Sequence, residues 1–250
     1  MSLFRLRAVA VVLLFAIAIS CNKDEATPPF VINNSVKPVD FLKEDNYTSL
    51  NVEVAWVEGY EPTQSAINHL VTFLTNRLNK SGGITITQRS MPATGRTTID
   101  VDVLRQLENT NRKSVVSGKN LTLWIMFLDA EYSGSTDTQK VLGISYGASS
   151  LAVFQKSVFT YVKPDMPSRY ALETFILTHE TGHILGLVNN GTSMISPHQD
   201  TGHGAHCSDT QCLMYWKAES NLKLGDLLGD DDLPVLDANC LADLKAAGGK

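Results

Sequence analysis

The sequence lacks the features of several protein classes. It has no run of basic residues, and its 21 Lys and Arg are outnumbered by 26 Asp and Glu, which gives a formal net charge of −5. This balance argues against nucleic acid or an anionic lipid surface as the main partner. Hydrophobic residues make up 43% of the chain, with 9 Phe, 7 Tyr and 3 Trp, which excludes a disordered acidic tail. No internal repeat is visible, and a length of 250 residues suits one domain once the ends are set aside.

The hydrophobic run at the N-terminus is too short to span a bilayer. Ala8–Ile19 comprises 12 residues, whereas a spanning helix needs about 20. Arg5 and Arg7 precede this run and the small residue Ser20 follows it, which is the order of a secretory signal peptide. We therefore expect residues 1–20 to be a signal peptide and the protein to be exported.

The residues that follow resemble a bacterial lipoprotein. Ala18-Ile19-Ser20-Cys21 is similar to a lipobox, and Asn22–Glu25 resembles the acidic signal that some Gram-negative bacteria use to send lipoproteins to the cell surface. The resemblance implies lipid attachment at Cys21, and hence an anchor in the outer membrane. Residues 21–48 are rich in Asn, Lys, Asp, Pro and Thr, and we expect them to form a flexible spacer before a monomeric domain at 49–250.

The body of the chain alternates expected strands with expected helices. Leu50–Val57 alternates apolar and polar residues, which is the period of a half-buried strand. Leu121–Leu128 is almost continuously apolar, as in a strand covered on both faces. Further strands are expected at 84–88, 141–146 and 151–154, and helices at 62–78 and 99–109. This order predicts an α/β (α+β) fold in which helices pack on a mixed sheet.

The histidines are unevenly placed along the chain. Five of the six histidines lie between residues 179 and 206, where uniform scattering would put fewer than one. The sixth, His69, lies on an expected apolar helix, and we interpret it as a packing or surface residue.

The motif His179-Glu180-Thr181-Gly182-His183 has the form HExxH and lies on an expected helix that Ser168 can cap. Residues four apart on a helix are neighbours, so His179 and His183 can each give a ring nitrogen to one zinc ion, at about 2.0–2.1 Å. Zinc lowers the pKa of a bound water towards about 7 and polarises a carbonyl. Glu180 would accept the proton of that water as it attacks a peptide carbonyl. Gly186 can end the helix in a left-handed conformation.

A third ligand is needed, and the residues alone leave it open. A histidine-rich loop follows the helix, with His198 beside Pro197, His203 between two glycines, and His206. Each of the three could complete the site.

The pattern HExxHxxG with a later ligand and methionine resembles that of the metzincin zinc peptidases. In that clan the third histidine stands three residues after the glycine, where this chain has Asn189. The stretch His206–Met214 is instead similar to the archaemetzincin continuation: His, Cys, four residues, Cys, one residue and Met. The resemblance implies that His206 is the third zinc ligand, that Met214 lies under the metal, and that residues 189–205 are an inserted loop. His198 and His203 stay as alternatives, and one of them could bind substrate, stabilise the oxyanion or occupy a second metal site.

The same resemblance implies a metzincin-like zincin fold, with a mixed twisted sheet, two packing helices, an active-site helix and a small C-terminal subdomain. Val141–Phe154 is similar to the metzincin edge strand, along which an extended substrate would pair.

Three cysteines remain after Cys21: Cys207, Cys212 and Cys240. Archaemetzincins hold a second, structural zinc on four cysteines, two of them in a downstream Cys-x-x-Cys pair. Only Cys240 stands near that place here, so the four-thiolate site is incomplete. In an oxidising compartment we expect one disulfide and one buried thiol, and the sequence leaves the pairing open.

The sequence thus predicts a zinc-dependent peptidase that is exported, lipid-anchored and acts on peptides or proteins. The alternative is a non-catalytic surface lipoprotein that binds a partner on a metalloprotease scaffold. Glu180 argues against this alternative, because a purely structural zinc site gains nothing from a free carboxylate there.

Overall fold

The computed structural model describes residues 35–162, 167–216 and 233–250. The expected signal peptide at 1–20, the lipid attachment at Cys21 and the spacer up to residue 34 lie outside the described residues. Within the described ranges, no helix combines the length and the hydropathy needed to cross a membrane.

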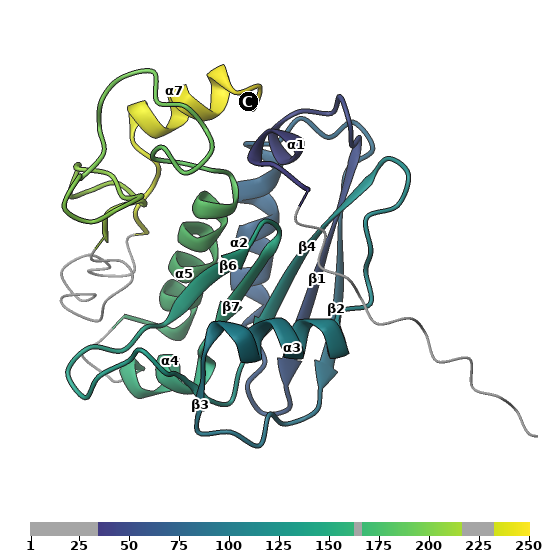
Figure 1. Ribbon diagram of the computed structural model, residues 1–250, viewed down its shortest axis with the longest axis vertical. Helices are drawn as coiled ribbons and strands as arrows, with labels where there is room; N and C mark the ends of the chain where they lie inside the picture. Colours follow the sequence, from purple (N-terminus) through teal and green to yellow (C-terminus); the bar gives the residue numbers. More distant parts are fainter. Residues whose placement is uncertain (1–34, 163–166, 217–232) are drawn as a thin grey trace, which may run out of the picture.

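A five-stranded mixed sheet forms the centre of the protein, with the strand order β2-β1-β4-β7-β6 (Figure 1). The first four strands of this order run parallel, and β6 pairs antiparallel with β7. The strands are β1 (Ser49–Val57), β2 (Ile84–Met91), β4 (Asn120–Phe127), β6 (Gly143–Gly147) and β7 (Ser150–Val153). The mixed sheet predicted from the alternation of strands and helices is therefore confirmed.

Helices cover both faces of the sheet (Figure 1). One face packs against α2 (Gln64–Thr75) and α5 (Arg169–Ile184), and the other against α3 (Val101–Asn111). The remaining elements are α1 (Pro38–Leu42), α4 (Gln155–Tyr161), α7 (Ala238–Ala246) and a two-stranded sheet of β3 (Thr98–Ile99) with β5 (Glu131–Tyr132).

Strand β4 shows why its sequence is almost continuously apolar. Alternate side chains point to opposite faces of a strand, and here both faces are core. Leu123 and Ile125 pack in the cluster under α2 and α5, whereas Trp124 and Met126 pack in the cluster under α3. The two-sided burial expected for this strand is confirmed.

The long helices begin at side-chain caps, which fixes where each one starts along the chain. Thr63 caps α2, Asp100 caps α3, Ser168 caps α5 and Asp237 caps α7, each accepting a hydrogen bond from the backbone N–H three residues later.

The segment 35–48, which we expected to belong to the spacer, is packed against the domain. Phe41 and Leu42 of α1 are fully buried in the main core. The ammonium group of Lys80 donates to the carbonyl oxygens of Asp40 at 2.7 Å and Tyr47 at 2.6 Å. The folded domain therefore begins before residue 49. The short helix α1 is apolar enough to pack in the core, although the surrounding stretch is polar and contains proline.

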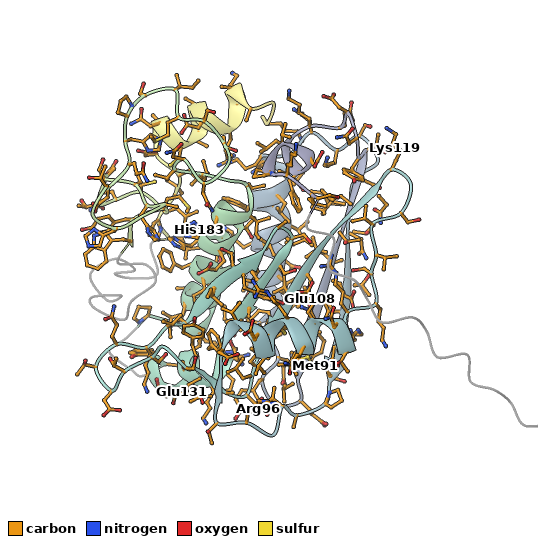
Figure 2. The ribbon with its side chains drawn as sticks, viewed as in Figure 1. Met91, Arg96, Glu108, Lys119, Glu131 and His183 are labelled. Atoms are coloured by element: carbon orange, nitrogen blue, oxygen red, sulfur yellow. The ribbon has the colours of Figure 1, made fainter. Side chains whose placement is uncertain are left out.

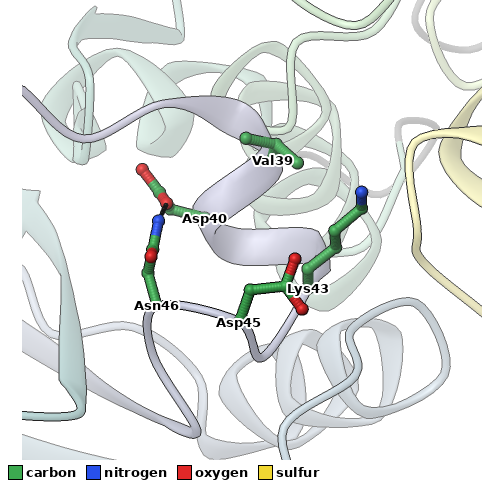
Figure 3. A pocket seen from close by; sticks show the side chains of 5 residues that line it. All are labelled: Val39, Asp40, Lys43, Asp45 and Asn46. Atoms are coloured by element: carbon green, nitrogen blue, oxygen red, sulfur yellow. Dashed lines mark hydrogen bonds between the residues drawn. The ribbon is translucent and has the colours of Figure 1, made fainter.

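A small pocket lies beside α1, lined by Val39, Asp40, Lys43, Asp45 and Asn46 (Figure 3). The side-chain amide of Asn46 donates to the carboxylate of Asp40 at 2.7 Å within it. None of its lining residues is among the candidate site residues.

Candidate metal centre

Helix α5 carries the HExxH motif and is buried on every side. All residues from Ala171 to Ile184 are buried, between the sheet and the loop-rich part of the chain that follows α5 (Figure 1).

Beyond the helix, Gly186 has a φ of +74°, and a Cβ there would lie 2.7 Å from the backbone nitrogen of Thr192. The left-handed end expected at this glycine is therefore confirmed.

Three histidines converge at the C-terminal half of α5, and we call His179, His183 and His206 the three-histidine cluster. One ring nitrogen of each lies within 4.8 Å of the others, and the Nε2 atoms of His179 and His183 are 3.2 Å apart. His183 is labelled on α5 in Figure 2. A tetrahedral zinc ion with bonds of 2.0–2.1 Å places its nitrogen ligands about 3.3 Å apart. The spacing therefore fits zinc.

Backbone carbonyls fix the tautomers of two of these rings. Nδ1 of His179 donates to the carbonyl oxygen of Leu213 at 2.7 Å, and Nδ1 of His206 donates to that of His203 at 2.6 Å. A carbonyl only accepts, so each Nδ1 donates a proton and each Nε2 is the nitrogen left to face a metal ion. This is the arrangement of zinc-binding histidines, in which an outer carbonyl orients the ring. The donor set of three imidazoles thus fits zinc in its chemistry as well.

Glu180 is buried beside the cluster, against strand β6. A Cβ added at Gly143 of β6 would lie 3.1 Å from Oε1 of Glu180 and would collide with the side chain of Ile176. A glycine is thus needed at this position for the carboxylate and the edge strand to approach each other. The sequence predicted Glu180 next to the metal ligands, and the resemblance to the metzincin edge strand used Gly143, but the contact between the two residues was not predicted.

Met214 packs directly beneath the helix between the two motif histidines. It is fully buried, and a Cβ added at Gly182 would collide with its sulfur. The preceding residue supplies the carbonyl that orients His179. The structure therefore places Met214 against Gly182 of the motif. The contact of the Leu213 carbonyl with His179 could not be predicted from side chains, because it is made by the backbone.

The other histidines lie apart from the three-histidine cluster. The ring of His203 stacks on Trp216 with centroids 3.9 Å apart, and its Nδ1 pairs with Asp200 at 2.7 Å. That hydrogen bond is the main reason why the pKa of Asp200 is lowered. His198 is buried next to Cys207 and Cys240. Both alternatives for the third ligand are thus placed elsewhere.

His69 also lies outside the site. It is on α2, where its Nδ1 lies 3.2 Å from the hydroxyl of Tyr170. Burial lowers the pKa of its ring. It packs between helices, as we expected.

The described cysteines form no disulfide. Cys207, Cys212 and Cys240 are free and buried, and the sulfurs of Cys212 and Cys240 are 3.7 Å apart, whereas a disulfide bond is about 2.05 Å long. The structure thus differs from the expected disulfide: the two sulfurs are neighbours at non-bonded distance. Burial raises the pKa of Cys207 to about 12.

The comparisons with known proteins concern the fold. No family model matches the sequence, and no curated protein matches it. Among solved structures, archaemetzincin from Methanopyrus kandleri is similar over 80% of this chain and 96% of its own, with 17% identity and a TM-score of 0.51. Metalloproteinase-II from Bacteroides fragilis is similar over 82% of this chain and 55% of its own, with 16% identity and a TM-score of 0.44. The protein therefore has the mixed α/β fold of metzincin structures, with a buried group of three histidines that suits a metal ion.

Proposed function

We propose that the protein is a zinc-dependent peptidase that hydrolyses peptide bonds. The observation that carries this proposal is the convergence of His179 and His183, from one turn of α5, with His206 from a distant loop, next to the buried carboxylate of Glu180. Three histidines leave the fourth position of a tetrahedral ion for the reaction, which distinguishes a catalytic from a structural site.

The chain's own groups supply the proton chemistry. When bound, zinc polarises the substrate carbonyl and makes water a stronger acid. Glu180 accepts the proton of the attacking water and passes it to the leaving amine, which is the work of a general base and then a general acid. The carbonyls of Leu213 and His203 hold the imidazoles of His179 and His206 in one tautomer throughout.

The substrate is proposed to be a peptide in extended conformation. Strand β6 lies at the end of the strand order and runs antiparallel to β7. An extended chain can add to such an edge through backbone hydrogen bonds, and Gly143 of β6 is where this edge meets Glu180. A peptide bond paired with β6 would therefore lie close to the general base.

We also propose that the protein is exported and anchored by lipid at Cys21 to the outer membrane. The support is in the sequence: Arg5 and Arg7, the 12-residue apolar run and the lipobox-like end at Cys21. A spacer between the lipid and the packed segment that begins near residue 35 would let the domain reach peptides at the membrane surface.

The test compares zinc-loaded wild-type protein with Glu180→Gln on a library of peptides. We expect the wild type to cleave and Glu180→Gln to lose about 10²–10⁴-fold in turnover while it keeps the same zinc content. Glu58→Gln, at an exposed position, is the matched control and should behave as wild type. Unchanged turnover in Glu180→Gln would remove this residue from the mechanism. A zinc-loaded wild type that cleaves no peptide would favour the non-catalytic binding protein.

A further inference from the structure

The N-terminal part of the described chain is held on the domain at several points, and we call residues 36–47 the strap. Phe41 and Leu42 are fully buried in the main core, and the backbone N–H of Asn79 donates to the carbonyl of Leu42 at 2.9 Å. The ammonium group of Lys80 donates to three strap carbonyls, those of Asp40, Lys43 and Tyr47. The strap is therefore a packed element of the fold.

The turn that follows α5 has an unusual backbone. Gly186 and Gly191 have φ values of +74° and +117°. Between them, Val188 and Asn189 have φ values of +54° and +62°. A positive φ is an outlier for a β-branched residue such as Val188, which is also fully buried. Conformations of this kind cost free energy and persist only where the surrounding structure holds them. Residues 186–191, which we call the left-handed turn, therefore need support from outside.

Pro38 of the strap supplies this support. A Cβ added at Gly186 would lie 2.8 Å from both Cβ and Cγ of Pro38, and one added at Gly191 would lie 2.9 Å from its Cγ. The proline ring thus lies directly against both glycines. Pro38 is the first residue of α1, where its fixed φ suits a helix. The strap and the left-handed turn are therefore packed together through one rigid side chain.

The left-handed turn also contacts a residue of the three-histidine cluster. The backbone N–H of Gly186 and the side-chain amide of Asn190 both donate to the carbonyl of His183, at 3.0 and 3.3 Å. In the other direction, the chain runs from the turn through the rest of the loop 189–205 to His206. The left-handed turn therefore connects two of the three histidines.

We propose that Pro38 is a positioning residue of the metal centre, and that docking of the strap and zinc binding at the three-histidine cluster favour each other. While the strap is docked, Pro38 keeps the turn left-handed and the end of α5 closed at His183. When the strap opens, the turn relaxes, and His183 and His206 lose their common position. This inference rests on the proposed zinc site, and it links the segment that leads to the proposed lipid anchor with the metal centre.

Zinc affinity of the full chain tests the positioning role. Pro38→Ala removes Cγ and Cδ of the ring, and alanine is a good helix former. We expect zinc to bind at least about 5-fold more weakly than in the wild type, which is the lower end of typical couplings between sites. Val39→Ala, at the next and exposed position of α1, is the matched control and should bind zinc as the wild type does. Competition with a chromophoric chelator measures the affinities, and equal affinities in the wild type and Pro38→Ala would overturn the inference.

A double-mutant cycle tests the contact itself. Gly191→Ala adds a Cβ that meets Pro38, and it also puts a side chain at a positive φ. The cost of that backbone conformation is the same in both backgrounds, so the cycle cancels it. We expect Gly191→Ala to weaken zinc binding less in the Pro38→Ala background than in the wild type. Equal losses in both backgrounds would show that Pro38 does not act on the turn.

Hydrogen exchange tests the reverse direction, because a coupling between two sites acts equally on both. Added zinc should slow amide exchange in the strap of the wild type, and should slow it less in Pro38→Ala. Peptides from α3, on the other face of the sheet, are the control and should show no such difference. Lys80→Met should speed exchange in the strap and weaken zinc binding together, whereas Lys113→Met, at an exposed lysine, should do neither.

The outcomes separate this inference from the zinc site on which it rests. A wild type that binds no zinc would overturn both. A wild type that binds zinc, with strap exchange that zinc does not change and an affinity that Pro38→Ala does not change, would overturn the coupling alone.

Discussion

His206 and Cys207 are consecutive in the chain, but their side chains face two different clusters. The ring of His206 lies 5.0 Å from that of His183, and the sulfur of Cys207 lies 3.3 Å from Nδ1 of His198. The backbone N–H of Cys207 also donates to the carbonyl of Met214 at 2.7 Å. One peptide bond therefore links the two clusters. Contacts that fix the position of Cys207 also fix the position of His206, which faces His179 and His183.

Replacing His206 by alanine should remove zinc from the three-histidine cluster. Loss of an outer partner of a metal ligand already costs about 10–100-fold in affinity, so loss of the ligand itself should weaken zinc binding by more than about 100-fold. His203→Ala is the matched control, because its ring faces Trp216 and its backbone carbonyl is retained. Competition with a chromophoric chelator measures both affinities. A weaker affinity in His203→Ala than in His206→Ala would contradict the ligand assignment.

A methyl group at Gly143 should disturb the approach of β6 to Glu180. The added Cβ of Gly143→Ala would collide with Ile176 and lie 3.1 Å from Oε1 of Glu180, so we expect a loss of about 1–3 kcal/mol in the free energy of unfolding. Turnover should also fall while zinc content stays the same, because the carboxylate is displaced and the histidines are not.

Gly147→Ala is the control for this prediction, since it lies on the same strand and its Cβ would meet only Ser150, at 3.5 Å. We expect a change within about 0.5 kcal/mol there. Urea unfolding and peptide turnover measure the two effects. Equal destabilisation by the two substitutions would show that the cost at Gly143 is unrelated to Glu180.

The stability contributed by Glu53 should depend on pH. This carboxylate is buried on β1; burial alone would raise its pKa, but hydrogen bonds from Ser114, Arg89 and Lys113 outweigh burial and lower the pKa below 4.5. A carboxylate whose pKa is lowered by folding stabilises the protein above its unfolded pKa, and this contribution is lost as the pH falls through the folded pKa.

We therefore expect Glu53→Gln to cost about 1.5–3 kcal/mol at about pH 7 and clearly less at about pH 3. Glu58→Gln, on the exposed turn after β1, should cost little at either pH. Chemical unfolding at both pH values measures the difference. A cost for Glu53→Gln that is the same at both pH values would mean that packing, rather than charge, gives this residue its effect.

The sequence predicted the sheet well because its signals are local. The alternation in β1 and the apolar run of β4 depend only on which faces of a strand are buried. The short helix α1 was missed because the burial of Phe41 and Leu42 depends on contacts with distant residues, such as the carbonyl contacts made by Lys80.

The site divides in the same way. Helical spacing alone predicts that the side chains of His179 and His183 lie together. No local period predicts the position of His206, which was inferred from a resemblance to a known family. The partners of His198 could not be predicted, because they are set by the docking of α7, which brings Cys240 and Asp243 to the loop. Hydrogen bonds to backbone groups, such as the one from His179 to the Leu213 carbonyl, could not be predicted because any residue type supplies the same carbonyl.

The complete burial of α5 limits how the proposed peptidase could change its selectivity. Because the helix from Ala171 to Ile184 has no exposed face, a substitution there alters packing before it alters recognition. Adaptation to new peptides would therefore be confined to the surrounding loops and to β6, where side chains can vary at small cost. Amide protons along the helix should exchange with solvent only when the whole domain opens, so loop exchange, not helix exchange, would distinguish one peptide complex from another.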